Sequence, residues 1–295
     1  MTRRPLALLL LALVHLSSAS CARARQPEAP PPSPRVVAVG DLHGDVEAAL
    51  AVLAMAGLVD DSGAWIGGDT VLVQTGDTTD RGPRSLGVME LMRRLQAEAA
   101  AAGGEVHALL GNHEAMNLKG DWRYVSEADV AEFGGLDARK AAFAADAPIG
   151  AWLRAADTAV VVDGVVFVHG GIRPQWAALG APGISKAVQA ALAGQASPEI
   201  LGDEGPLWYR GYALAPEPVA CAELGEALVA LSARRMVVGH STRKDGRIAS
   251  RCGGQLLLID TGISAHYGGH RAALEIRQND AKALYPEGPV DLPDP

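Results

Sequence analysis

Residues 35–44 read RVVAVGDLHG, a short apolar run that stops at a glycine and leads into Asp41 and His43. Residues 71–76, VLVQTG, have the same order and lead into Asp77. Runs of this length, rich in Val and Leu and bounded by Gly, are typical of buried strands. We therefore expect two buried strands, each followed directly by side chains that can bind a cation.

The same arrangement occurs four more times along the chain. The runs are 106–111 before Asn112 and His113, 165–168 before His169, 236–239 before His240, and 256–259 before Asp260. Stretches with helical spacing lie between several of them, at 45–56, 85–102 and 221–233. Strands that alternate with helices indicate an α/β fold. Because ligand crevices form beyond the carboxyl ends of such strands, these side chains are expected to share one cleft.

These side chains suit a metal site. Asp41 and His43 stand two residues apart on a glycine-flanked loop and can bind one ion, while the two oxygens of Asp77 can bridge two ions. The remaining candidate ligands are the amide oxygen of Asn112 and the imidazoles of His169 and His240. Oxygen and nitrogen ligands without a thiolate suit Mn, Fe or Zn.

Each motif has an ordinary structural explanation as well. A single His at a strand end can be a hydrogen-bonded core residue, and Gly-Asp pairs are common in turns. Gly40, Gly76 and Gly111 can simply terminate strands. The occurrence of all the motifs in order, each at a strand end, favours a functional site.

Five motifs resemble the signature of the metallophosphoesterases, close to the serine/threonine phosphoprotein phosphatases. They are GDLHG (40–44), GDTTDRG (76–82), GNHE (111–114), HGG (169–171) and GH (239–240). The continuation AMNLKGDWRYV after GNHE is similar to the Shewanella-like protein phosphatase branch. The resemblance implies a four-layer α/β/β/α sandwich of two mixed sheets flanked by helices.

The resemblance also implies two metal ions. Asp41, His43 and Asp77 would hold the first. The second would be held by Asp77, Asn112, His169 and His240, with Asp77 bridging. A hydroxide bridging the two ions would attack phosphorus directly.

The catalytic residues follow from the same resemblance. His113 would protonate the leaving group, with Asp80 orienting its ring. Arg81 would bind phosphate oxygens through its planar guanidinium. Arg210, in PLWYRG, would be a second phosphate-binding arginine, although an exposed surface arginine is the alternative.

Several further residues are candidates for contact with the substrate. Tyr267, in AHYGG, resembles an active-site tyrosine of the same phosphatases. Asn117, Arg123 and Tyr124 belong to the branch-specific stretch and are weaker candidates.

The substrate expected from these residues is a phosphorylated protein or a small phosphomonoester. The alternatives are a diadenosine tetraphosphate hydrolase or nucleotide phosphoesterase of the same superfamily, and a non-enzymatic binding protein that kept the fold. A nucleic-acid partner is not expected, because the formal net charge of -8 does not suit a phosphate-backbone surface.

The N-terminal residues are typical of an export signal. Residues 1–20 combine two arginines, an apolar stretch at 6–16 and small residues. Cys21 is a candidate for lipidation, and residues 21–34 form a proline-rich tether. We thus expect an exported protein, periplasmic or lipid-anchored to a bacterial membrane. The catalytic domain is expected at 35–283 and a flexible tail at 284–295.

Two cysteines remain besides Cys21. In an oxidising compartment Cys221 and Cys252 can form a disulfide, because Cys252 lies in a predicted hairpin at 247–259. The alternative is two separately buried thiols, which behave as small apolar side chains.

Overall fold

The computed structural model describes residues 33–295. The predicted signal at 1–20, Cys21 and the predicted tether up to residue 32 lie outside the described residues. Within residues 33–295, no helix combines the length and hydrophobicity that crossing a membrane requires.

The first sheet contains the strand predicted from RVVAVG. β1 (Val36–Val39) pairs in parallel with β2 (Val71–Gln74), which pairs in parallel with β3 (Glu105–Ala108). Three antiparallel strands extend the sheet beyond β1: β9 (Ala273–Arg277), β10 (Asp280–Tyr285) and β11 (Gly288–Leu292). The order is β11-β10-β9-β1-β2-β3.

The second sheet is also mixed, with the order β4-β5-β6-β8-β7. Its parallel centre consists of β5 (Val165–Val168), β6 (Arg235–Val238) and β8 (Leu256–Leu258). β4 (Ala159–Val162) and β7 (Ala249–Arg251) are antiparallel to their neighbours. The β7–β8 pair confirms the predicted hairpin.

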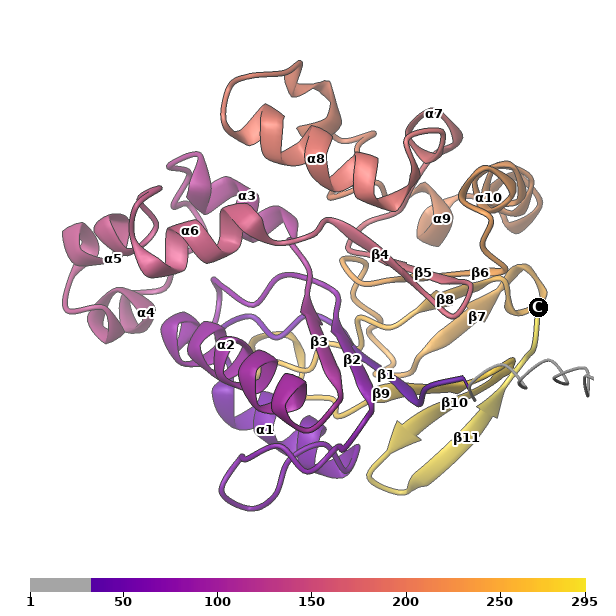
Figure 1. Cartoon of the computed structure of the whole chain (residues 1–295), viewed down its shortest axis with the longest axis horizontal. Helices are drawn as coiled ribbons and strands as arrows, with labels where there is room; N and C mark the ends of the chain where they lie inside the picture. Colours follow the sequence, from indigo (N-terminus) through magenta and orange to yellow (C-terminus); the bar gives the residue numbers. More distant parts are fainter. Residues whose placement is uncertain (1–32) are drawn as a thin grey trace, which may run out of the picture. The chain divides into compact units, whose positions relative to one another are not determined.

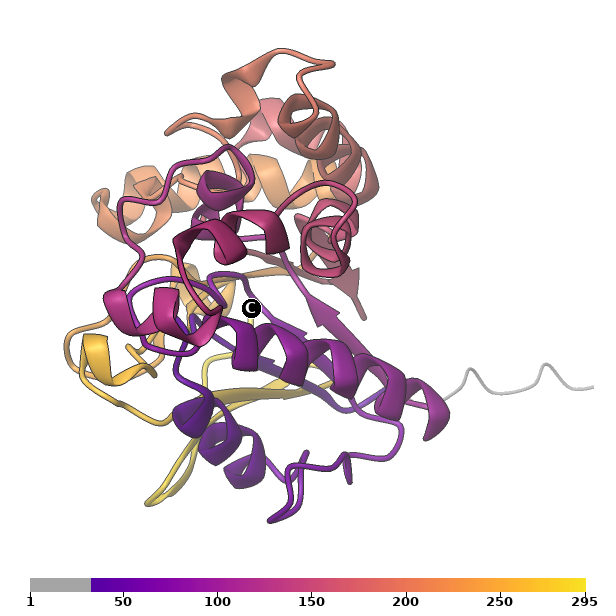
Figure 2. The ribbon, with the colours of Figure 1, turned by 90° about the vertical axis from the view of Figure 1, so that its left-hand side faces the viewer.

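Helices cover the outer face of each sheet (Figures 1 and 2). α1 (Val46–Met55) and α2 (Ser85–Ala101) cover the first sheet, whereas α7 (Pro174–Ala177), α8 (Gly180–Leu192) and α10 (Glu217–Leu231) cover the second. Alternate residues of each strand face opposite ways. Val37 therefore packs under α1 and α2, and Val36 packs between the sheets. The four-layer α/β/β/α fold is confirmed.

Shorter helices fill the connections. α3 (Asn112–Leu118), α4 (Glu127–Glu132), α5 (Leu136–Ala142) and α6 (Pro148–Ala155) join β3 to β4, and α9 (Gly211–Leu214) precedes α10. The 3₁₀ turns within residues 33–295 are η1 (Pro198–Leu201), η2 (Cys252–Gly254) and η3 (Ala265–Tyr267). In Figure 1, α4 to α6 lie together at one end of the two sheets.

The prediction of a flexible tail at 284–295 is wrong. β11 pairs with β10 over the whole length of β11. Within β10, Ala281, Ala283 and Tyr285 alternate inward and are buried in the core between the sheets. The Tyr285 hydroxyl also accepts a hydrogen bond from the Ile248 backbone N–H at 2.9 Å. This buried alternate face holds the C-terminal hairpin in place.

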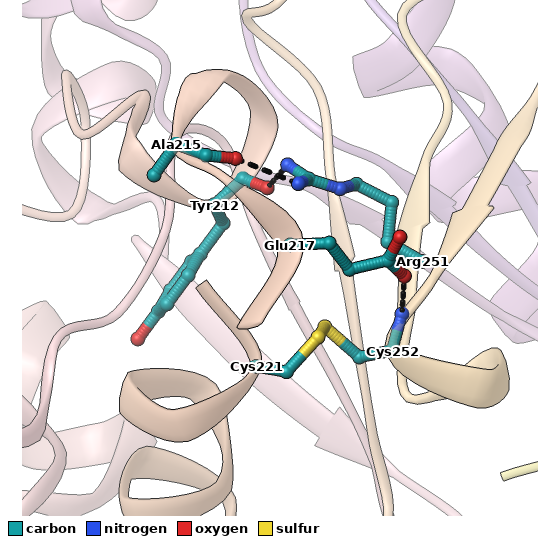
Figure 3. Close-up of a disulfide and its surroundings, with 6 residues drawn as sticks. All are labelled: Tyr212, Ala215, Glu217, Cys221, Arg251 and Cys252. Carbon is teal, nitrogen blue, oxygen red and sulfur yellow. Dashed lines mark hydrogen bonds between the residues drawn. A yellow bond between two sulfur atoms is a disulfide. The ribbon is translucent and has the colours of Figure 1, made fainter. Parts of the chain in front are cut away.

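The predicted disulfide is confirmed (Figure 3). It joins Cys221 of α10 to Cys252 of η2, with the two α-carbons 5.3 Å apart. Glu217 adds a second link, because its carboxylate accepts the Cys252 backbone N–H at 2.8 Å. Arg251 donates to the carbonyl oxygens of Tyr212 and Ala215. The bridge and Arg251 thus tie the segment around α9 to the second sheet.

Replacing both bridge cysteines, Cys221→Ser with Cys252→Ser, should lower the free energy of unfolding. The bridge closes a loop with a sequence separation of 31, and a loop of this size is worth about 3–4 kcal/mol. Urea unfolding with and without dithiothreitol measures the effect. The reductant should lower the wild-type midpoint and leave the double variant unchanged; a wild-type midpoint that ignores the reductant would contradict the bridge.

Candidate active site

The candidate residues meet where parallel strands of the two sheets end. Some of these residues follow β1, β2 and β3 of the first sheet, and the others follow β5, β6 and β8 of the second sheet. The residues that follow these strands are Asp41 and His43, Asp77, Asn112 and His113, His169, His240, and Asp260. All of them are at most 5% exposed. The predicted convergence of distant segments on one place is therefore observed.

The loops that carry these residues have unusual backbone geometry. Positive φ angles occur at His43 (42°), Asp77 (58°), Asp80 (68°), Arg81 (68°) and His240 (62°). Each such non-glycine residue costs on the order of 1–3 kcal/mol, and persists only where its surroundings impose it. Here the backbone N–H of His43 donates to the Asp77 carbonyl at 2.9 Å, which locks two of these loops together.

The glycines of the motifs do more than terminate strands. A Cβ on Gly111 would lie 2.2 Å from Asp77 Oδ1, and a Cβ on Gly239 would lie 2.4 Å from Asp41 Oδ1. Any side chain at either position would push a carboxylate out of place. These two glycines therefore allow the carboxylates to approach the neighbouring loops.

Three histidines each have one ring nitrogen that is hydrogen-bonded to a backbone carbonyl oxygen. A ring nitrogen that faces a carbonyl must carry the hydrogen, so the other nitrogen keeps its lone pair. The hydrogen-bonded atoms are His43 Nδ1, 3.1 Å from the Thr79 oxygen, His169 Nδ1, 2.9 Å from the Thr75 oxygen, and His240 Nε2, 3.2 Å from the Trp208 oxygen.

The ring nitrogens that keep a lone pair lie close to other hydrogen-bond acceptors. His169 Nε2 lies 2.8 Å from Asn112 Oδ1, 3.1 Å from His240 Nδ1 and 3.3 Å from Asp77 Oδ2. Lone pairs this close repel one another unless a cation lies between them. Ligand atoms about 2.0–2.2 Å from one ion are ~3–3.5 Å apart, which matches this spacing. These four residues fit one metal ion.

A second group of acceptors adjoins the first. His43 Nε2 lies 3.8 Å from Asp41 Oδ2 and 3.7 Å from Asp77 Oδ2. Asp77 Oδ2 faces both groups, whereas Oδ1 accepts the His113 backbone N–H, so a single oxygen adjoins both groups rather than the two oxygens expected from the sequence. The residues present thus fit two adjacent ions.

Burial makes a cation favourable here. Burial lowers the pKa of His43 to about 4. Burial, with the nearby His169 and Arg210, lowers the pKa of His240 to about 2. Both rings are therefore neutral at neutral pH. Burial, with the charges of Asp260 and Asp77, raises the pKa of Asp41 well above its usual value, so this carboxylate lacks compensating charge.

His113 and Asp80 form a buried pair beside these ligands. His113 Nδ1 lies 2.8 Å from Asp80 Oδ2, and His113 Nε2 lies 3.9 Å from Asp77 Oδ2. Burial opposes protonation of His113, but Asp77 and the hydrogen bond to Asp80 outweigh it and raise the pKa of His113. These two carboxylates therefore favour the protonated form of the ring.

A cavity of about 150 Å³ opens onto these groups. Its wall contains the predicted residues Asp41, His43, Asp77, Arg81, Asn112, His113, Arg210, His240 and Tyr267. Tyr124, Trp208 and Thr242 complete it. Asp80 and His169 are fully buried and contact the wall residues from behind.

The two predicted arginines both reach the cavity. The Arg81 guanidinium stacks on Tyr124, 3.9 Å from the ring centroid, and within residues 33–295 its Nε has no hydrogen-bond partner. Arg210 Nη1 donates to the His240 carbonyl oxygen at 2.5 Å. Two guanidinium groups thus bring positive charge to a cavity whose wall also contains the carboxylates of Asp41 and Asp77.

Tyrosine rings pack against two of the imidazoles. Tyr267 lies 4.8 Å from His43, and Tyr124 lies 5.0 Å from His113, measured between ring centroids. The other two weak candidates do not line the cavity. Asn117 donates to Asp80 instead, and Arg123 is an exposed partner of Asp121.

Sequence reasoning missed two buried supports of this site. The Glu114 carboxylate accepts backbone N–H groups of Asp77 (2.9 Å), Thr78 (2.7 Å) and Gly111 (2.8 Å), and so joins two ligand loops. Its place in GNHE was the available signal. Arg139 contacts Asp80 from α5, and nothing in its local sequence indicated this role.

Comparison with known proteins gives consistent matches. The family described as calcineurin-like phosphoesterase matches residues 34–243. An uncharacterized protein of Schizosaccharomyces pombe is 39% identical over 84% of this chain and 79% of its own length. Shewanella-like protein phosphatase 2 of Arabidopsis thaliana is 32% identical over 87% of this chain and 78% of its own. The crystal structure of a cold-active protein-tyrosine phosphatase of a psychrophilic Shewanella species is 30% identical, with a TM-score of 0.77 over 88% of this chain and 80% of that one.

Replacing Asp77 with Asn should cost the protein at least one bound metal ion, because the change removes charge from both groups of acceptors while keeping the side-chain shape. Metal content after loading with Mn or Zn, measured by mass spectrometry, gives the result. Asp69→Asn, at an exposed position, is the control and should bind metal like the wild type. Full metal content in Asp77→Asn would refute the bridging role.

Proposed function

We propose that this member of the calcineurin-like phosphoesterase family uses two metal ions to hydrolyse phosphomonoesters, chiefly on phosphoproteins. The chain belongs to the branch of the Shewanella-like protein phosphatases and is a phosphatase. The ions would be held by Asp41, His43 and Asp77 on one side, and by Asp77, Asn112, His169 and His240 on the other. When bound, Mn, Fe or Zn ions would activate the attacking water and offset negative charge.

The observation that carries this proposal is one cavity with three kinds of group on its wall. Closely spaced acceptor atoms lie beside two arginines and beside His113, whose ring is hydrogen-bonded to the Asp80 carboxylate. Arg81 and Arg210 would bind the phosphoryl oxygens, since a guanidinium matches their geometry. His113, held by Asp80, would donate its proton to the leaving oxygen.

The size of the cavity supports a protein substrate over a dinucleotide. At about 150 Å³, it is smaller than the ~300–1,000 Å³ of pockets that enclose a whole small molecule. A phosphoryl group and the start of its leaving group would enter, while the rest of the substrate stays outside. A phosphorylated side chain on a protein meets that condition.

We also propose that the protein is exported, and either periplasmic or lipid-anchored through Cys21. The order of charged, apolar and small residues in 1–20 supports export. The Cys221–Cys252 disulfide is consistent with an oxidising compartment.

A substrate panel tests the proposed function. Protein loaded separately with Mn, Fe or Zn should release phosphate from peptides carrying phosphoserine, phosphothreonine or phosphotyrosine, and from small phosphomonoesters. Diadenosine tetraphosphate should be a poor substrate. Faster turnover of the dinucleotide than of every phosphopeptide would favour the alternative function.

His113→Asn should separate proton donation from metal binding. Turnover of phenyl phosphate should fall by ~10²–10⁴-fold, the usual contribution of a positioned acid. The loss should be smaller for p-nitrophenyl phosphate, whose leaving group needs little protonation, and metal content should stay at the wild-type level. If both esters lost turnover equally, His113 would not be the proton donor.

A further inference from the structure

Arg139 of α5 is a charged side chain with no exposed surface. Its guanidinium makes four hydrogen bonds, which use all three of its nitrogens. They are Nε to Asp129 Oδ2 at 2.9 Å, Nη1 to Asn117 Oδ1 at 2.5 Å, and Nη2 to Thr79 Oγ1 at 3.1 Å and to Asp80 Oδ1 at 3.0 Å. The group therefore has a fixed position and orientation.

Aromatic rings keep water away from this guanidinium. Its Cζ lies 4.8 Å from the centre of the Phe143 ring, and 5.3 Å from those of Phe133 and Trp122. Ion pairs are strong when water is excluded, and losing one partner leaves an uncompensated buried charge. The charge of Arg139 is thus matched by the two carboxylates that it contacts, Asp80 and Asp129.

The contact with Asp80 links Arg139 to the active site. Asp80 is also fully buried, and its two oxygens have different partners. Oδ1 accepts from Arg139, and Oδ2 accepts from His113 Nδ1 at 2.8 Å. Asn117 reinforces this arrangement, because its amide donates to both oxygens of Asp80 and accepts from Arg139. The carboxylate plane is thereby held with one oxygen directed at His113.

We infer that Arg139 is a positioning residue for the phosphatase reaction, acting through Asp80 on the proton donor His113. This inference rests on the proposed function. Arg139 would hold the Asp80 carboxylate so that His113 Nε2 faces the leaving oxygen. The helices between β3 and β4 would then serve to bring a cation to the back of the catalytic pair.

Arg139→Lys tests this inference, because it keeps the charge but removes the planar fork that reaches four acceptors at once. The turnover number for phenyl phosphate should fall by ~10–100-fold, the usual cost of losing a group that orients an active-site side chain. For p-nitrophenyl phosphate the fall should be less than ~3-fold, because its leaving group needs little protonation. KM for both esters and metal content should stay close to the wild-type values, since Arg139 contacts neither substrate nor metal ligand.

The chain offers a matched control in Arg235, which is also fully buried. Arg235 bonds to the carbonyl oxygens of Gly254, Asn279 and Pro293, away from the cavity. Arg235→Lys should lower thermal stability and leave the ratio of turnover on the two esters unchanged. Wild-type and Arg235→Lys activity together report on the proposed function, whereas only the ester ratio of Arg139→Lys reports on the inference.

A double-mutant cycle shows whether Arg139 acts through Asp80. In an Asp80→Asn background, Arg139→Lys should reduce phenyl phosphate turnover by less than ~2-fold further, since coupled residues are not additive. Additive losses, or equal losses on both esters, would overturn the inference.

If Arg139→Lys does not fold, Asp129→Asn replaces it. That variant keeps Arg139 but removes the charge that anchors the far side of its guanidinium. A loss confined to phenyl phosphate would support the inference, and unchanged turnover or an equal loss on both esters would overturn it.

Discussion

The carboxylate of Asp77 is the buried charge around which the site is built. Its Oδ2 faces both groups of acceptor atoms, and its Oδ1 accepts the His113 backbone N–H at 3.0 Å. A carboxylate in this position loses its hydration, and hydrogen bonds and cations must compensate for that loss. Glu114 holds the Asp77 loop against the β3 loop, and Gly111 lets the two approach. The positive φ angles nearby are the backbone cost of this arrangement.

Both sheets contribute to the site, because neither carries the complete set of candidate ligands. Asp41, His43, Asp77 and Asn112 follow strands of the first sheet, while His169 and His240 follow strands of the second. The apolar core between the sheets, which includes Val73, Phe167 and Leu257, sets the distance between the two sheets. A change in that packing would move the two groups of ligands apart, so core stability and the geometry of the site are linked.

The groups proposed to act on a substrate come from outside the sheets. His113 lies in the first turn of α3, and α5 supports it through Arg139. Arg210 lies directly before α9, in a different connection of the fold. The segment with Arg210 is held by its bond to the His240 carbonyl, by Arg251 and by the disulfide beyond it. The proposed proton donor and one proposed phosphate-binding arginine are therefore held by different contacts.

The sequence by itself indicated the buried strands and the candidate ligands at their ends, because an apolar run that stops at glycine and a polar residue marks a strand end. It left the Cys221–Cys252 disulfide as one of two alternatives, which the structure decided. Only the tertiary structure decided that residues 288–292 form β11, since a short strand rich in Gly and Pro has no clear local period. It also placed Arg139 against Asp80, although α5 looks like an ordinary surface helix in sequence. Contacts between residues far apart in the chain depend on how complete elements pack, which no local pattern encodes.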